Sequence, residues 1–124
     1  MLQIVWFEIP VHDIERAVAF YTAAFGLDEV KIMDDGTRRT ATLRNTSEGG
    51  IPGVSLTQTP GFEPSNQRGP WAYLDAMSDF DAAVARVKAA GGTIVAEKTS
   101  MGEAGSYASI LDTEGNLLAL YTHP

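Results

Sequence analysis

The stretch DIERAVAFYTAAFG, residues 13–26, decides the fold, because DFDAAVARVKAAGG at residues 79–92 repeats it. Half of the aligned positions are identical, and both stretches begin with Asp and end with Gly. Asp suits a helix N-cap, and Gly suits the left-handed position that follows a helix. Apolar residues recur at helical spacing in both stretches. The pattern predicts two amphipathic helices that each pack on one face.

The segments around the two helices repeat as well, and they are typical of strands. One precedes each helix and three follow it, at residues 2–11, 28–33, 37–45 and 52–58 in the first half and 71–77, 93–98, 106–111 and 116–122 in the second. Alternating apolar residues bounded by turn residues favour strands here. Each half is therefore predicted to be a βαβββ unit.

Two such units bury their apolar faces best when they lie side by side. We therefore predict an α+β fold in which two βαβββ units form a curled mixed sheet, a cup, with outer helices. The domain is expected to span residues 1–124, with unit one at 1–58, a Pro- and Gly-rich linker at 59–69 and unit two at 70–124.

Composition excludes several classes of function. The chain has 124 residues, a formal net charge of -7 and no cysteine. Acidic chains repel the phosphate backbone, so we expect no nucleic-acid partner. Thiolate nucleophiles and cysteine-based metal sites are excluded. Neither a basic leader nor an apolar run near the ~18 residues of a membrane span is present, so we expect a cytoplasmic protein with no membrane contact.

Three motifs carry a resemblance to a known family. They are WFEIPVHDIERAVAFYTAAFGL at residues 6–27, DFDAAVARVKAAGGTI at 79–94 and GSYASILDTEGNLLAL at 105–120. Together they resemble the glyoxalase/bleomycin-resistance/extradiol-dioxygenase superfamily, whose fold is the vicinal oxygen chelate fold. The resemblance implies the fold more strongly than the chemistry, because this superfamily hosts isomerases, dioxygenases, thiol transferases and binding proteins.

The same resemblance implies where a catalytic divalent metal would bind. Family enzymes hold it with a His on the first strand, a His on the strand that opens unit two and a Glu on the last strand. These positions fall on Trp6, on Trp71 or Ala72 depending on the register around Met77, and on Ala119. None of these side chains binds a metal ion. We therefore expect no cofactor, and a divalent metal is disfavoured.

Strand alternation selects the residues that face the cup. Trp6 and Glu8 share one face of the first strand. If Trp71 matches Trp6, then Trp71, Tyr73 and Asp75 share the corresponding face of the second unit. Ala119 completes the predicted ligand-binding set of Trp6, Glu8, Trp71, Tyr73, Asp75 and Ala119. Aromatic faces beside carboxylates suit a flat or cationic organic ligand.

Glu8 has two interpretations. It either has a structural role, in a salt bridge with Arg16, Arg38 or Arg39 or in a backbone hydrogen bond, or it is a ligand-facing catalytic acid or general base. His12 and His123, the only histidines, are expected to be exposed, beside a helix cap and at the chain end.

Three functions follow, in this order. The first is a metal-independent protein that binds a small molecule between the protomers of a homodimer. The second is a glyoxalase-like lyase or isomerase, or a dioxygenase-type enzyme, that uses Glu8 with a relocated metal. The third is a ligand-free structural or regulatory module. Whether the chain is an enzyme stays open at this point.

Overall fold

The computed structural model describes residues 2, 4–43, 53–76 and 79–124. In chain order its elements are β1 (Trp6–Pro10), α1 (Ile14–Phe25), β2 (Ile32–Asp34), β3 (Arg39–Leu43), β4 (Gly53–Gln58), β5 (Ala72–Asp75), α2 (Phe80–Ala89), β6 (Thr93–Ser100), the short 3-10 helix η1 (Gly102–Ala104), β7 (Ser106–Leu111) and β8 (Leu117–Thr122). This order confirms the two predicted βαβββ units.

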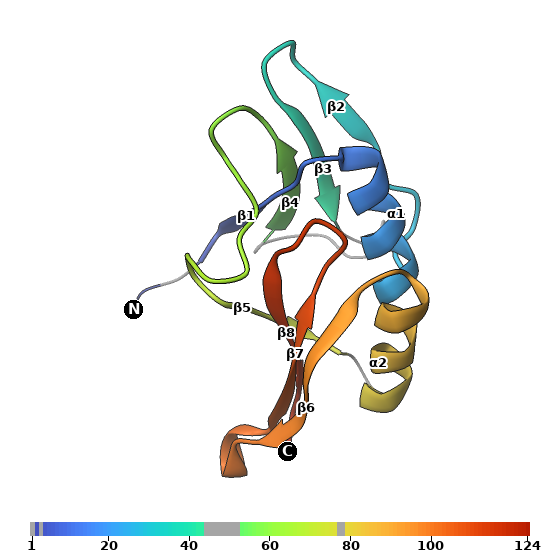
Figure 1. Ribbon diagram of the computed structural model, residues 1–124, viewed down its shortest axis with the longest axis vertical. Helices are drawn as coiled ribbons and strands as arrows, with labels where there is room; N and C mark the ends of the chain where they lie inside the picture. Colours follow the sequence, from blue (N-terminus) through green and yellow to red (C-terminus); the bar gives the residue numbers. More distant parts are fainter. Residues whose placement is uncertain (1, 3, 44–52, 77–78) are drawn as a thin grey trace.

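Each unit forms its own four-stranded mixed sheet. The strand order is β1-β4-β3-β2 in the first sheet and β5-β8-β7-β6 in the second. The first strand of each unit runs parallel to the last, β1 to β4 and β5 to β8, whereas the other pairs are antiparallel. Both helices lie along the same side of the molecule (Figure 1). The α+β fold class is therefore as predicted.

The capping residues act largely as the sequence predicts. Asp13 Oδ1 accepts a hydrogen bond from the Arg16 N–H at 3.1 Å, and Gly26 ends α1 in the left-handed conformation with φ 62°. Asp79 caps α2 in the same way, through the Ala82 N–H at 3.0 Å. One detail differs from the prediction. The left-handed residue after α2 is Gly91, with φ 100°, rather than Gly92.

Gly92 is needed for close packing instead. A Cβ atom at this position would lie 2.7 Å from Val87 Cγ1 and 2.8 Å from Phe20 Cε1. Since Phe20 belongs to α1 and Val87 to α2, the glycine lets unit two approach the first helix. Arg86 adds a second link by donating from Nε to the Ala24 carbonyl at 3.0 Å. The two units are thus joined through their helices.

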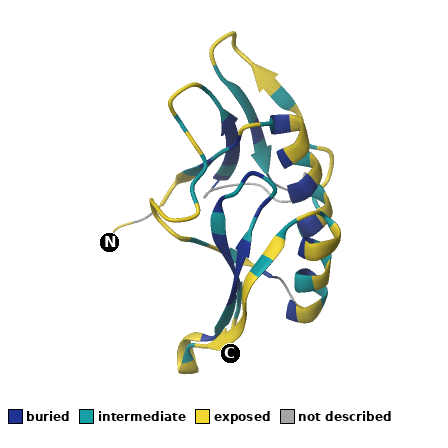
Figure 2. Cartoon of the chain, in the orientation of Figure 1, coloured by how far each residue is buried: buried dark blue, intermediate teal, exposed yellow. Residues whose placement is uncertain are grey.

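The apolar core lies between the helices and one face of each sheet (Figure 2). Ile9, Ala41 and Leu56 of the first sheet are fully or nearly fully buried, as are Ile110 and Leu120 of the second. These residues alternate along their strands with the side chains that face away from the core. None of the described helices is long and apolar enough to cross a membrane.

The DTEGN turn, residues 112–116, ties unit two to α1. Asp112 Oδ1 accepts hydrogen bonds from the N–H groups of Glu114 (2.8 Å) and Asn116 (2.9 Å). Its Oδ2 accepts one from the Tyr21 hydroxyl at 2.6 Å. Burial, with the nearby Asp112 carboxylate, raises the pKa of Tyr21 well above its ordinary value. The Tyr21 hydroxyl is therefore a structural donor.

Glu114 makes the second part of this link. Its side chain is fully buried and accepts from the N–H groups of His12 (2.9 Å) and Asp13 (2.8 Å) at the start of α1. Arg16 also donates to it, from Nε at 2.6 Å and Nη2 at 3.0 Å. Burial by itself raises the pKa of Glu114, but the hydrogen bonds from Arg16, Asp13 and His12 outweigh it and lower the pKa. The carboxylate is held ionised in a structural role.

Candidate functional site

Glu8 lies on the face of β1 that points away from the core. Its Oε1 accepts a hydrogen bond from Thr57 Oγ1 at 2.8 Å and forms an ion pair with Arg38 Nη2. Of the three arginines considered as partners, the structure selects Arg38. Arg16 binds Glu114 and Arg39 binds Glu15. The Glu8 side chain is 34% exposed, so the carboxylate is reachable from solvent while already paired.

Trp6 lies on the same face of β1 and covers Gly53 of β4. A Cβ atom at Gly53 would lie 2.2 Å from Trp6 Cζ3. The indole therefore rests on bare backbone, which only glycine offers. Trp6 remains 50% exposed, so its other side faces solvent.

The second sheet carries an aromatic cluster of Trp71, Tyr73 and Tyr107. The ring centroids are 5.4 Å apart for Trp71 and Tyr73, 5.8 Å for Trp71 and Tyr107, and 5.6 Å for Tyr73 and Tyr107. These separations are typical of stabilising aromatic contacts. Trp71 and Tyr73 remain 42% and 43% exposed. The cluster is therefore an accessible aromatic surface.

Ala119 lies beneath this aromatic cluster. It pairs with Tyr73 across β5 and β8, and with Ser109 across β7 and β8. Ala119 is fully buried, yet it is outside the core cluster that its neighbours Leu118 and Leu120 join. The Ala119 side chain therefore points to the face of the sheet that lies opposite the core, which is the face of Tyr73.

The register between β5 and β8 decides whether Trp71 or Ala72 lies on the same face of the sheet as Ala119. Tyr73 is opposite Ala119, so alternation places Trp71 on that face too. Ala72 is opposite Leu118 and packs against the core. Met77, whose register raised the question, lies outside the described residues.

Asp75 extends the same face toward the chain end. It pairs with Tyr121 in the sheet, and its Oδ2 lies 3.9 Å from His123 Nε2. The His123 ring also packs edge-on against Tyr121, with centroids 4.9 Å apart. His123 is exposed, as predicted, and so is His12, whose Nδ1 lies 3.3 Å from Glu63 Oε2.

The predicted ligand-binding residues thus fall into two groups. Trp6 and Glu8 lie on the first sheet, whereas Trp71, Tyr73, Asp75 and Ala119 lie together on the second. Within the residues that the structure describes, no group of three or more His, Cys, Asp or Glu side chains is arranged to hold a metal ion. Tyr107 was not among the ligand-binding residues predicted from the sequence. The register of the β7–β8 hairpin, in which Tyr107 pairs with Tyr121, was the signal that could have found it.

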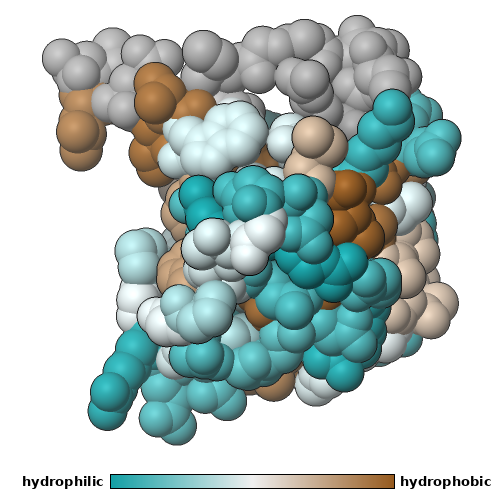
Figure 3. Space-filling model, turned by 90° about the horizontal axis from the view of Figure 1, so that it is seen from above, coloured by the Kyte–Doolittle hydropathy of each residue, from teal (hydrophilic) through white to brown (hydrophobic). Residues whose placement is uncertain are grey.

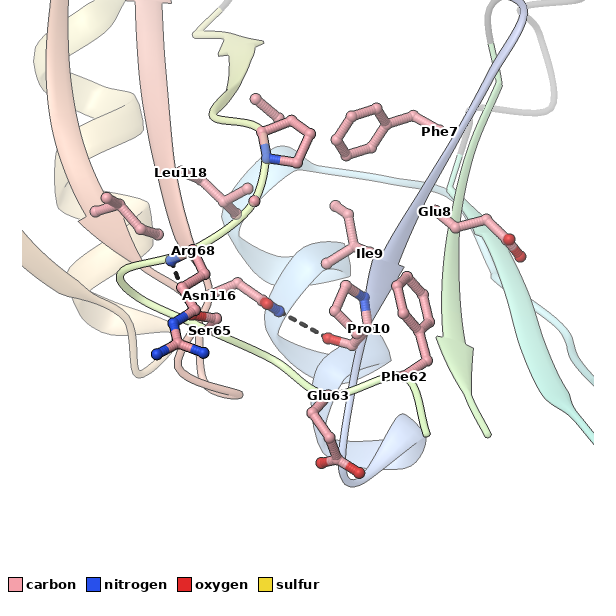
Figure 4. A pocket seen from close by; sticks show the side chains of 14 residues that line it. Phe7, Glu8, Ile9, Pro10, Phe62, Glu63, Ser65, Arg68, Asn116 and Leu118 are labelled. Atoms are coloured by element: carbon pink, nitrogen blue, oxygen red, sulfur yellow. Dashed lines mark hydrogen bonds between the residues drawn. The ribbon is translucent and has the colours of Figure 1, made fainter. Parts of the chain in front are cut away.

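A separate pocket of about 180 Å³ lies on the other side of β1. Phe7 and Ile9 point into it, whereas Glu8 points away from it across the strand (Figure 4). The linker between β4 and β5 and the start of β8 form the other walls. We call this cavity the seam pocket, because residues of both units line it.

Exposed apolar side chains also mark the N-terminal segment before β1. Leu2 is 97% exposed, and Ile4 and Val5 are 60% and 58% exposed. From above, hydrophobic side chains appear at the edge of a mostly hydrophilic face (Figure 3). Large apolar side chains gathered at a surface indicate an interaction site.

Comparisons with known proteins agree with this architecture. Residues 3–120 match the family model described as the Glyoxalase/Bleomycin resistance protein/Dioxygenase superfamily. The chain belongs to this superfamily. Among curated proteins it resembles the "Putative glyoxylase CFP32" of Mycobacterium bovis and of Mycobacterium tuberculosis, with 26% identity over 117 residues. The match covers 94% of this chain but 42% of each relative, so the chain spans about two-fifths of their length.

Solved structures show the same fold. A glyoxylase/bleomycin resistance protein/dioxygenase domain from Frankia has a TM-score of 0.74 at 16% identity, with 100% of this chain and 93% of that chain covered. TnmS3, an antibiotic binding protein from Streptomyces, has a TM-score of 0.69 at 24% identity, with coverages of 100% and 98%. A maize glyoxalase I mutant has a TM-score of 0.74 at 21% identity, covering 98% of this chain and 45% of that one.

Proposed function

We propose that this chain binds a flat organic molecule on the aromatic cluster, without the divalent metal that enzymes of its superfamily hold. The observation that carries the proposal is the pairing of Tyr73 with Ala119. The position that the family resemblance gives to a metal-binding Glu is a fully buried alanine that pairs with an aromatic residue across the sheet. Stacking on aromatic rings replaces coordination as the means of holding a ligand.

The charges around the aromatic cluster favour a ligand that is neutral or cationic. Asp75 lies two residues from Tyr73 on the same face, and the chain carries a formal net charge of -7. A cation gains from the faces of Trp and Tyr rings and from a nearby carboxylate. The antibiotic-binding fold neighbour TnmS3 lends support to a binding role for this architecture.

We further propose that the ligand is enclosed between two copies of the chain in a homodimer. Trp71 and Tyr73 are half-exposed on one sheet, and Trp6 and Glu8 are half-exposed on the other. A two-fold interface would bring the Trp6 group of one copy toward the aromatic cluster of its partner. Ala119 would remain the floor of that site. On sequence composition, we keep the cytoplasm as the proposed compartment.

The two other functions have less support. The contacts of Glu8 favour its structural role, because Oε1 already accepts hydrogen bonds from Arg38 and Thr57. A ligand-free module would have no use for two large aromatic side chains left 42% and 43% exposed beside one another. The binding proposal explains these side chains.

Dye binding tests the proposal directly. We would titrate the protein into a flat cationic dye such as acridine orange and follow the dye's fluorescence anisotropy, with and without a metal chelator. The proposal predicts saturable binding that the chelator leaves unchanged. It also predicts that Trp71→Ala weakens binding by about tenfold, the upper range for an aromatic and cation–π contact. Met33→Ala, which removes another exposed apolar side chain from the first sheet, is the matched control.

Two results would contradict the proposal. One is binding that the chelator abolishes. The other is equal binding by the wild type and Trp71→Ala. Light scattering after size-exclusion chromatography tests the dimer separately, and a monomer at all concentrations would overturn that part alone.

A further inference from the structure

We infer that the seam pocket is a second binding site, for a small carboxylic acid with a compact apolar body. The site is separate from the aromatic cluster, since Ala72 and Leu118 line it and strand alternation places Tyr73 on the opposite face of the second sheet (Figure 4).

The walls are apolar and come from both units. Phe7 and Ile9 of β1 form one side, and Ala72 of β5 and Leu118 of β8 form the other. Phe62 of the linker closes the end next to Pro10, as Figure 4 shows. A cavity of about 180 Å³ suits one six-membered ring, since an apolar cavity of about 150 Å³ accepts benzene.

The pocket is held open by hydrogen bonds outside the core. The Leu117 N–H donates to the Ser65 carbonyl at 3.2 Å, which fixes the linker against the start of β8. Asn116 Nδ2 donates to the Pro10 carbonyl at 2.8 Å, which fixes the end of β1 against the same turn. Two sides of the pocket are therefore spaced by directed contacts, so the pocket exists before a ligand arrives.

The polar groups at the mouth favour an anion. Arg68 lines the pocket, and its guanidinium has no ion-pair partner within the described part of the chain. Ser65 Oγ accepts from the N–H groups of Gln67 (3.1 Å) and Arg68 (3.0 Å), which leaves its own proton to be donated. A guanidinium and a hydroxyl that both donate suit a carboxylate.

The negative charge at the mouth does not cancel this preference. Glu63 also lines the pocket, and its Oε2 lies 3.3 Å from His12 Nδ1, a contact that is an ion pair only when His12 is protonated. In Figure 4 the Glu63 carboxylate and the Arg68 guanidinium lie at separate points of the rim. The proposed pose places the ligand carboxylate on the Arg68 side of the pocket and its ring between the apolar walls of Phe7 and Leu118.

Benzoate is the probe that we would use, with benzamide as its neutral analogue. The measurement is a nuclear magnetic resonance titration of the full, nitrogen-labelled chain, which reports shifts residue by residue. We expect saturable shifts in the millimolar range for backbone amides of Phe7, Arg68 and Leu117. Benzamide and the variant Arg68→Gln should each weaken binding by about tenfold, as expected for one lost charge-assisted hydrogen bond.

Two further variants sharpen the test. Ala72→Leu fills the pocket and should abolish the shifts, and Lys88→Gln, an exposed helix position with the same change of charge, should leave them unchanged. Thermal unfolding shows whether each variant is folded. If Ala72→Leu does not fold, the test depends on Arg68→Gln alone.

The inference is overturned if benzoate produces no saturable shift, or if its shifts fall on Trp71 and Tyr73. Equal affinity for benzoate and benzamide would overturn the assignment of an anionic ligand. The dye experiment on the aromatic cluster is independent of all these outcomes.

Discussion

Tyr73 lies directly opposite Ala119 in the parallel pairing of β5 with β8, and its ring joins Trp71 and Tyr107 above that alanine. The small side chain and the large ring fit each other. A longer residue at position 119 would meet the aromatic cluster, because Ala119 has no exposed surface.

Ala119→Glu is therefore expected to destabilise the fold rather than restore a metal site. Burying a carboxylate without partners and crowding a packed position should together cost about 2–4 kcal/mol in the free energy of unfolding. Tyr73→Ala in the same chain should recover part of this loss, because it opens space and admits water. Urea unfolding of both single variants and the double variant measures the coupling. Strictly additive losses would show that Tyr73 does not cover Ala119.

Tyr21→Phe should lower stability more than Tyr121→Phe does. Tyr21 donates to the buried carboxylate of Asp112, so its loss should cost about 2 kcal/mol, as for hydrogen bonds to charged groups. Tyr121 donates to the Ala104 carbonyl at an exposed site, and its loss should cost under about 1 kcal/mol. Both variants remove one phenolic oxygen, so they are matched. Equal losses in urea unfolding would contradict a structural role for Tyr21.

Glu114 predicts how stability depends on pH. Its pKa is lowered in the folded chain from an ordinary value of 4.5, so the unfolded chain takes up the proton more readily. Its contribution is therefore fully present above about pH 5 and is lost as the pH falls through the lowered value. Glu114→Gln should cost about 2 kcal/mol at pH 7, and its difference from the wild type should shrink below pH 4.5.

Glu15 is an exposed carboxylate with which the salt dependence of the buried Glu114 can be compared. Its pKa is also lowered, chiefly by the hydrogen bond from Arg39, but the carboxylate is exposed. The effect of Glu15→Gln should therefore diminish in high salt, whereas that of Glu114→Gln should persist. A Glu114→Gln difference that stays constant from pH 7 to pH 3 would contradict the assignment.

Gly53→Ala should displace the Trp6 indole, because the added Cβ would lie 2.2 Å from its Cζ3. The ring is half-exposed and can move, so we expect a change in tryptophan emission and a loss of about 1 kcal/mol. In a Trp6→Ala background the same substitution should cost almost nothing, since the conflicting ring is gone. An equal loss in both backgrounds would show that the backbone, not the indole, requires glycine at this position.

The helices were predictable because their signals are local. Asp13 and Asp79 cap the helices as expected, and the core positions follow the helical period. The assignment of Gly92 to the left-handed position was wrong because two glycines follow one another. Gly91 takes the positive φ, and Gly92 is required by Phe20, a contact far apart in sequence.

Strand ends were less predictable than strand faces. The segment 28–33 supplies only the start of β2 at Ile32, whereas β6 continues past the predicted residue 98 to Ser100 with irregular pairing to β7. Alternation alone placed Trp6 with Glu8 and Trp71 with Tyr73. It could not show Arg38 beside Glu8, Tyr107 beside Trp71, or the seam pocket. All three depend on how separate strands and units meet.

Metal content tests the central claim, that an aromatic surface replaces the metal site of the superfamily. The untagged protein would be incubated with excess divalent ions, desalted and measured by elemental analysis per chain. The account predicts a metal content near zero and the same dye affinity before and after incubation with the ions. A content near one ion per chain, lost on substitution of Glu8, would contradict it and make metal-dependent catalysis the leading function.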